Sequence, residues 1–303
     1  MAAGRTDLTE NNGYIPEEKG SVAVQATLVN SVVESFARRE NMASRTKGVP
    51  RFVSDAPSIV AEGVDIPNSD TTLDEVVLTA RKYAQIFNIS EEDINDSLVD
   101  TLNTYKREWA SQWARKFDNA CLGVTAAADG DDGQPFTSLY RALATDPNAP
   151  VSQIIQTAGD VEFSDISNAL GFAESSKYFD AANTVFIAHP KMLAHIRNME
   201  TAGGNLVLPD PLGARPGSLF GYPLVISYGA ATSAAAVAAP SGNPLLIVGN
   251  RNMMINGVRG GIESAISRDA DFSKDGVLLK TRVRRGFAIA EASAFAVVEK
   301  TAS

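Results

Sequence analysis

The longest amphipathic pattern in the chain covers residues 90–121, SEEDINDSLVDTLNTYKREWASQWARKFDNAC. Apolar side chains recur there every three or four residues, the spacing that places them on one face of an α-helix. The pattern predicts one long helix, about 45 Å from end to end, with Ser90 as its N-cap. Because both tryptophans of the chain lie on the apolar stripe, we expect this helix to be the centre of a hydrophobic core. The predicted buried stripe contains Leu98, Leu102, Tyr105, Trp109, Trp113 and Phe117.

Three shorter patterns precede the long helix. Apolar residues recur every fourth position from Val24 to Phe36, which predicts a short amphipathic helix within residues 21–39 that ends near the arginine pair 38–39. In residues 48–75, prolines and a glycine separate short β-branched runs. This composition favours an extended hairpin or flap. Residues 76–89 alternate apolar and polar positions, and they predict a strand that leads into the long helix.

The middle of the chain mixes helical and strand patterns. Residues 165–173 predict a helix capped by Ser164. The continuous apolar run 184–188 predicts a buried strand, and the His-Pro pair that follows it is a suitable helix start. Two further short strands are predicted at 245–248 and 253–255.

Near the C-terminus, basic and apolar residues alternate along one predicted strand. Lys280, Arg282 and Arg284 lie on one face, and the residues between them form a face that can pack on a core. The full order of elements is β, long α, an α/β insert and then β. This order indicates an α+β fold in which early and late strands pair around the insert.

Composition limits the classes of protein that the chain can represent. With 303 residues, 44% of them hydrophobic, it can bury one or two cores. A net charge of −9 argues against tight, sequence-independent binding to nucleic acid, although local basic strips remain. The single cysteine, Cys121, excludes an internal disulfide and is expected to be a buried apolar residue. The N-terminus lacks a signal-peptide core and no apolar run is long enough to cross a bilayer.

The sequence contains no convincing catalytic, cofactor or metal site. His189 and His195 are six residues apart, which does not place them on one helix face, and no acid or cysteine joins them at ligand spacing. Residues 129–133 resemble a calcium loop, but Tyr140 occupies the twelfth position, where a glutamate is needed. The glycines of 257–261 lack the spacing of a nucleotide loop. We therefore expect no catalysis and no cofactor.

The basic strand face has two interpretations. It is either the solvated face of an edge strand or a contact with another copy of the chain. In the second case, the flap supplies the opposite charge, because its residues include Asp55, Glu62, Asp65, Asp70 and Asp74. Exposed ion pairs contribute only about 0–1 kcal/mol each, so they would set the register of such a contact more than its strength. A long flap without a small-molecule site favours a protein that binds copies of itself.

Several segments together resemble one protein family. SIVAEGVDIPNSDTTLDEVVLTARKYAQIFNISEEDINDS resembles the extended loop, strand and start of the spine helix in tailed-phage major capsid proteins of the Hong Kong 97-like fold. Downstream, TVFIAHPKMLAHIRNMETAGGNLVLPD, SLFGYPLVIS and LLIVGNRNMMINGVRGGIESAIS resemble the axial-domain strand and helix, the glycine-x-proline strand and the return strands of that family. The similarity keeps the same order from about residue 15 to residue 298.

The resemblance implies a domain division. It assigns an N-terminal arm to residues 1–47, an extended loop to 48–75, a peripheral domain with the spine helix to 76–123 and 256–303, and an axial domain to 124–255. In that family, hexamers and pentamers close into an icosahedral shell around double-stranded DNA. The implied protein is a structural subunit of the virion, assembled in the host bacterial cytoplasm. Its implied partners are copies of itself, a portal and packaged DNA bound without sequence specificity, with room for a decoration protein and no membrane.

Two departures from the family pattern refine these expectations. Met1 lies only a short arm before the matching region, which implies a separate scaffolding protein, or none, in place of a cleaved scaffolding segment. Some members also join neighbours by a lysine–asparagine isopeptide bond between the extended loop and the peripheral domain. Here no lysine lies between Pro50 and Ala80, and no asparagine lies between Gly257 and Ser303. We expect no such cross-link.

Two alternatives to a phage shell remain at this stage. The first is an encapsulin, which uses the same fold as a compartment for protein cargo. The second, from a different class, is a soluble α+β enzyme with an unrecognised site. Packaged DNA and a portal would favour the phage shell, whereas bound enzyme cargo would favour the encapsulin. A monomer with a ligand-dependent melting temperature would favour the enzyme.

Overall fold

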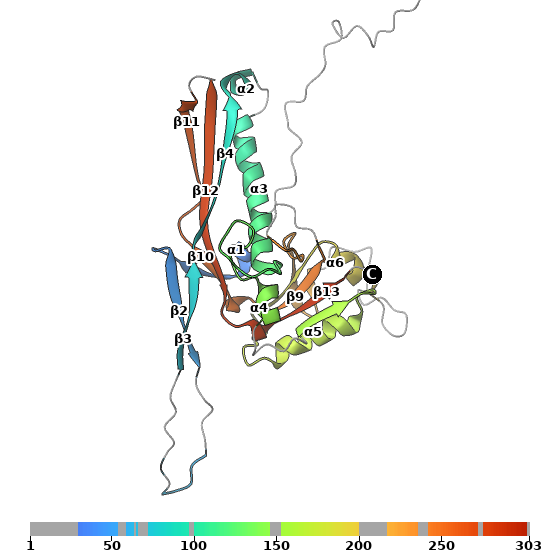
Figure 1. Ribbon diagram of the computed structural model, residues 1–303. Helices are drawn as coiled ribbons and strands as arrows, with labels where there is room; N and C mark the ends of the chain where they lie inside the picture. The colour runs from blue at the N-terminus through green and yellow to red at the C-terminus, as the bar shows by residue number, and fades with distance from the viewer. Residues whose placement is uncertain are drawn as a thin grey trace, which may run out of the picture.

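The computed structural model describes residues 30–53, 59–63, 65, 72–96, 100–145, 153–199, 217–235, 242–271 and 275–301. Figure 1 shows three parts: a long ribbon of strands beside a long helix, a hairpin that projects in the opposite direction, and a second sheet covered by helices. The helices are α1 Val32–Phe36, α2 Glu91–Asp96, α3 Thr101–Leu122, α4 Leu139–Thr145, α5 Phe163–Ser175 and α6 Met192–Asn198, with 3-10 turns η2 Arg251–Met253 and η4 Ala292–Ala294.

The first sheet is organised around one long strand, β12. Its order is β1-β10-β12-β11, and β4 pairs with the other edge of β12. Along the first edge, β10 and β11 pair with successive parts of β12. Strands from before and after the α/β insert thus pair directly, which confirms the α+β arrangement predicted from the order of elements. The strands are β1 Arg38–Asn41, β4 Arg81–Ser90, β10 Met254–Val258, β11 Glu263–Asp271 and β12 Gly276–Ile289.

The second sheet has the order β5-β13-β9-β6-β8-β7. All five residues of β6 are buried, as the apolar run predicts. The helices α5 and α6 cover this sheet and share its apolar cluster. Both begin at residues other than those predicted: α5 follows Glu162, whose N–H donates to Asp165 Oδ2 at 3.0 Å, and α6 begins two residues after Pro190. The strands are β5 Ile154–Thr157, β6 Thr184–Ala188, β7 Ser218–Leu219, β8 Tyr222–Ile226, β9 Leu245–Asn250 and β13 Phe295–Lys300.

The predicted single helix of residues 90–121 is wrong in one respect, because two helices occupy it. Ser90 ends β4, and its Oγ accepts the Glu92 N–H at 3.3 Å at the start of α2. The long helix α3 starts afresh after Asp100, whose carboxylate accepts the Asn103 N–H at 3.2 Å. Aspartate is a preferred N-cap residue, and its local hydrogen bond competes with a continuous helix. With 22 residues, α3 is about 33 Å long.

The apolar stripe of α3 is buried in its C-terminal half. Trp109, Trp113 and Phe117 are buried and stacked, with ring centroids 6.3 Å and 5.5 Å apart along the series. Tyr105 is 38% exposed although its ring lies against Phe87, and Leu102 is half-buried. Leu98 lies outside the described residues. Hence the core prediction is confirmed for the last three aromatic positions, and Cys121 beyond them is fully buried as expected.

Near the N-terminus, the structure corrects the predicted helix of residues 21–39. Its first part, with Val24, lies outside the described residues. The described helix α1 has only five residues, and the arginine pair 38–39 belongs to β1 instead of a helix end. Pairing with β10 explains the difference, because a parallel partner strand extends this backbone.

The strand predicted over 76–89 is divided at Ala80. Before this residue, β3 Thr72–Thr79 pairs with β2 Thr46–Val53 in the hairpin, and after it β4 joins the first sheet. The chain therefore passes from one sheet to another at Ala80. The set of alternating positions that faces the core changes at the same residue. Leu78 is buried, but Ile86, an apolar residue of the same alternating pattern, is 60% exposed, because in β4 the alternate positions, such as Tyr83, face α3.

Candidate assembly surfaces

The hairpin β2–β3 projects from the body in the direction opposite to the long ribbon of β11, β12 and β4 (Figure 1). Its strands pair antiparallel over eight residues each, so the sequence prediction of an extended hairpin is confirmed. Toward the far end, Ile59 is fully exposed, with a relative exposure of 103%. Glu62 and Asp65 are also exposed and flank Gly63, whose φ of +79° is readily adopted only by glycine. Asp55 and Asp70 lie outside the described residues.

Arg51 anchors the hairpin to the rest of the subunit. Its Nη1 donates to the Ala290 carbonyl at 2.9 Å and to Glu291 Oε2 at 3.2 Å. Its Nη2 bonds to the Asp74 carboxylate, and this hydrogen bond holds the pKa of Asp74 below its ordinary value. Asp74, one of the acids predicted to contact another copy, therefore already has a partner in its own chain.

The basic face of β12 is present, as the alternating pattern predicts. Lys280 is exposed, whereas Leu279 and Val283 are buried on the opposite face. The interpretation as an edge strand is wrong, because β4 pairs with one side of β12 and β10 and β11 pair with the other. Arg282 forms an ion pair with Glu263 at 2.6 Å. Within the described part of the chain, the Lys280 and Arg284 side chains have no hydrogen bond or ion pair.

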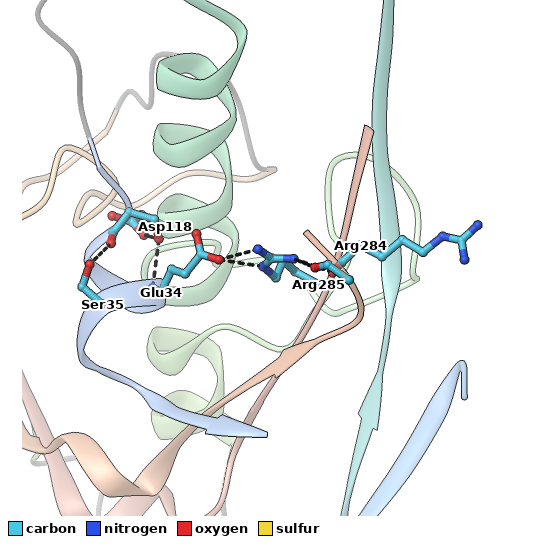
Figure 2. Close-up of polar contacts among 7 residues, drawn as sticks. Glu34, Ser35, Asp118, Arg284 and Arg285 are labelled. Atoms are coloured by element: carbon cyan, nitrogen blue, oxygen red, sulfur yellow. Dashed lines mark hydrogen bonds and ion pairs between the residues drawn. The ribbon is translucent and has the colours of Figure 1, made fainter. Parts of the chain in front are cut away.

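Arg284 and Arg285 project from opposite faces of β12 (Figure 2). Arg285 is buried, with 4% exposure, and its Nε donates to Glu34 Oε1 at 2.9 Å. Its guanidinium also lies over the Trp113 ring at 5.6 Å. The adjacent arginines therefore differ in role: Arg285 joins α1 to the core, and Arg284 faces away from it.

A cationic hollow of about 510 Å³ lies where the hairpin base meets the first sheet, and we call it the arginine hollow. Four segments supply its cations: the residues before β2, the start of β4, the residue after β10, and β12. The loop of residues 130–135 also lines it. Sequence reasoning identified only Arg284, because the other cations are scattered along the chain and share no periodicity. The cations that line the hollow are Arg45, Arg81, Lys82, Arg259 and Arg284.

Asp118 fastens α1 to the long helix from a fully buried position (Figure 2). Its carboxylate accepts the backbone N–H groups of Val32 at 2.9 Å and Val33 at 3.2 Å, at the N-terminus of α1. It also accepts the hydroxyls of Ser31 at 2.6 Å and Ser227 at 2.7 Å. Burial raises the pKa of Asp118 above its ordinary value, and these four hydrogen bonds oppose the rise.

We expect Asp118→Ala to lower the free energy of unfolding by about 2–4 kcal/mol, because it leaves buried N–H groups without an acceptor. Asp118→Asn retains one acceptor oxygen of the same shape and should cost less. Urea unfolding followed by circular dichroism measures both changes. Equal stability of wild type and Asp118→Ala would show that the N-terminus of α1 does not depend on this carboxylate.

The two histidines do not form a common site. His189 follows β6 and its Nδ1 accepts the Lys191 N–H at 3.2 Å, whereas His195 lies on α6 with its Nδ1 3.6 Å from an Asp160 carboxylate oxygen. Nowhere in the described ranges do three His, Cys, Asp or Glu side chains gather in a way that could hold a metal ion. Among the same residues, no helix combines the length and apolar character needed to cross a membrane.

His189 should make the subunit sensitive to acid. Burial, followed by the charge of Lys191, lowers the pKa of His189 from 6.5 to about 4. Between these two values the unfolded chain binds a proton that the folded chain does not, so stability should fall as pH drops from 6.5 to 4. His189→Gln should flatten this part of the stability curve, as measured by urea midpoints across pH. His195→Gln is the matched control, and an equal flattening there would contradict the assignment.

Comparisons with known proteins give the context for these surfaces. The phage capsid family model matches residues 13–300. The chain is 27% identical over 115 residues to the probable major capsid protein gp17 of Mycobacterium phage L5, and the match covers 37% of this chain and 35% of that protein. A solved structure from Mycobacterium phage Bobi is 17% identical, with a TM-score of 0.75 over 99% of this chain and 100% of its own. The capsid of the native GTA particle is 16% identical, with a TM-score of 0.70 over the same shares.

The projecting hairpin, the long helix and the two sheets define a structural protein with an α+β capsid fold, which these solved structures share over nearly the full chain. The chain belongs to the phage capsid family. The prediction of a major capsid protein with the Hong Kong 97-like fold, made from residues 15–298, is thereby confirmed at the level of family and fold.

Proposed function

We propose that this chain is the major subunit of a tailed-phage head and that it assembles as hexamers and pentamers into an icosahedral shell around double-stranded DNA. The observation that carries the proposal is the family match over residues 13–300 in a chain whose hairpin projects far from its own body. Ile59, toward the far end of this hairpin, is fully exposed and is therefore available for contact with another copy. The GTA capsid, described with C5 symmetry, supports the pentamer part of the proposal.

The domain division is also part of the proposal. We propose that residues 1–47 are an arm, that 48–75 are the extended loop, that 76–123 and 256–303 form the peripheral domain, and that 124–255 form the axial domain. The strand composition of the two sheets supports this division. The strands β4 and β12 share the first sheet, whereas most strands of the second sheet lie within residues 124–255. The acidic flap is then a surface for contact between copies, and cations on the neighbouring copy supply the opposite charge.

The further partners are those of a phage head. We propose a separate scaffolding protein, a portal and DNA bound without sequence specificity, with a decoration protein as an optional addition. Assembly would take place in the host bacterial cytoplasm, and the product would be the virion shell. The subunit would act by containment without catalysis. The family match favours this function over the encapsulin and the soluble enzyme considered from the sequence.

The test is negative-stain electron microscopy with light scattering on the purified chain, expressed alone and with the neighbouring phage gene products. Closed shells, tubes or hexamers would support the proposal. Shells from the chain alone would show that a scaffold is not obligatory. A stable monomer under both conditions would overturn the proposal.

A further inference from the structure

We propose that the arginine hollow receives the acidic tip of a second copy's flap. In this arrangement the flap contact is made at the base of the neighbour's hairpin, not on the open face of its β12. The inference rests on the proposed function, because it requires that copies assemble. It adds the receiving site, which the alternating pattern of β12 does not reveal.

The charge of the hollow favours an anionic occupant. Five cations line it, and the described lining includes only two carboxylates, Asp131 and Asp132. Asp132 is already held by Lys116, whose Nζ lies 2.6 Å from its Oδ1. Within the described chain, none of the five cationic side chains has an ion pair. Like charges that share a small space repel one another, so an anion that enters the hollow relieves the repulsion.

Arg81 shows that the hollow is organised and not merely open surface. Its guanidinium lies against Gly130, where an added Cβ would be 2.0 Å from Nη2. Gly130 has a φ of +85°, a backbone conformation that glycine adopts readily. The Nε of Arg81 is buried without a hydrogen-bond partner in the described structure. A guanidinium held in this way can donate a paired set of N–H groups to a carboxylate.

The flap tip, residues 54–71, has the complementary chemistry. It contains four acids and no lysine, arginine or histidine. Two of these acids, Glu62 and Asp65, are exposed beside the turn at Gly63. Near them lies the fully exposed Ile59, and the hollow offers apolar walls at Ala80 and Pro135 beside its cations.

The occupant must come from another subunit. The hollow lies at the base of the hairpin, and the hairpin projects away from that base (Figure 1). Strands β2 and β3 of the same chain therefore extend away from its own hollow. A second copy supplies an identical acidic tip in equal number to the hollows, and a closed shell can repeat such a contact around its symmetry axes.

Charge reversal and its rescue test the pairing. We expect Arg45→Glu with Arg284→Glu, and separately Glu62→Arg with Asp65→Arg, each to reduce shell yield about tenfold or more at roughly 0.1 M salt, where charges are screened only beyond about 10 Å. The four substitutions together restore opposite charges and should return most of the yield. Lys280→Glu is the matched control, because Lys280 shares a strand and a face with Arg284 but does not line the hollow.

The readouts are particle counts by negative-stain microscopy and melting temperatures of the subunits. Neutral substitutions, Arg45→Gln with Arg284→Gln, give a milder second test if a reversed variant fails to fold. The inference is overturned if the variant with all four substitutions folds but does not assemble. It is equally overturned if Lys280→Glu lowers shell yield as much as the hollow substitutions do. A combination of two results would also overturn the inference. Tripolyphosphate would raise the melting temperature of wild type but not of the hollow variant, and the variant with all four substitutions would not regain shell yield.

Different results would contradict the proposed function and the flap-to-hollow contact. If wild-type chain never forms shells, with or without the neighbouring gene products, the proposed function fails as well. If wild type forms shells and the hollow variants do so at the same yield, only the flap-to-hollow contact is wrong.

Discussion

Replacing residues 56–69 with a short glycine-serine linker should leave a folded subunit that forms no shells. The body should remain intact because the hairpin base has its own apolar cluster, which includes Val49, Leu78 and Ile255. The anchor from Arg51 to the Ala290 carbonyl also lies outside the removed segment. Assembly should be lost because the removed segment carries the exposed Ile59 and the two exposed acids Glu62 and Asp65. Light scattering and microscopy measure assembly, and thermal unfolding measures the subunit.

A second variant separates the length of the flap from its chemistry. It keeps the original number of residues but replaces 56–69 with glycine and serine throughout. If side chains carry the contact, this variant should also fail to assemble. Shells at wild-type yield from the shortened variant would show that the flap is not needed between copies. Loss of cooperative unfolding would show that it is needed within the subunit.

Phe117→Ala should destabilise the subunit by about 3–5 kcal/mol, the usual cost of removing a buried aromatic side chain. Phe117 is fully buried on α3. Its ring centroid lies 5.5 Å from Trp113, 6.2 Å from Tyr83 and 6.1 Å from Phe136. One side chain thus joins the long helix to β4 and to the loop before α4. Since domains are stable by only about 5–15 kcal/mol, a loss of this size should leave much of the chain unfolded at moderate temperature.

Tyr105→Ala is the matched control for this prediction. It removes an aromatic ring from the same helix, but Tyr105 is 38% exposed and pairs with one ring, Phe87 at 5.1 Å. We expect a loss of roughly 1 kcal/mol, close to the value of a single aromatic pair. Trp109→Ala, at a buried position, should resemble Phe117→Ala. Urea unfolding curves compare the three, and wild-type stability in Phe117→Ala or Trp109→Ala would refute the role of the long helix as the centre of the core.

Features that depend on local periodicity are predictable from the order of the amino acids. The stripe of α3 from Trp109 to Phe117, the buried strand β6 and the alternating faces of β12 are set by spacings of two or three to four residues. Such spacings decide which side of an element is apolar before any partner is known. The extended hairpin was predictable for a similar reason, because prolines and a glycine limit the backbone locally.

Which elements lie side by side depends on contacts between residues far apart in the chain. The helix predicted over 90–121 is interrupted before α3, because the Asp100 carboxylate caps a new helix start. The strand predicted over 76–89 is divided at Ala80, because its two parts pair with strands of different sheets. The arginine hollow is the clearest case. Arg45 and Arg284 are separated by most of the chain, yet pairing of early and late strands brings them to one cavity. No local spacing carries that information, because long-range pairing depends on how whole surfaces fit together.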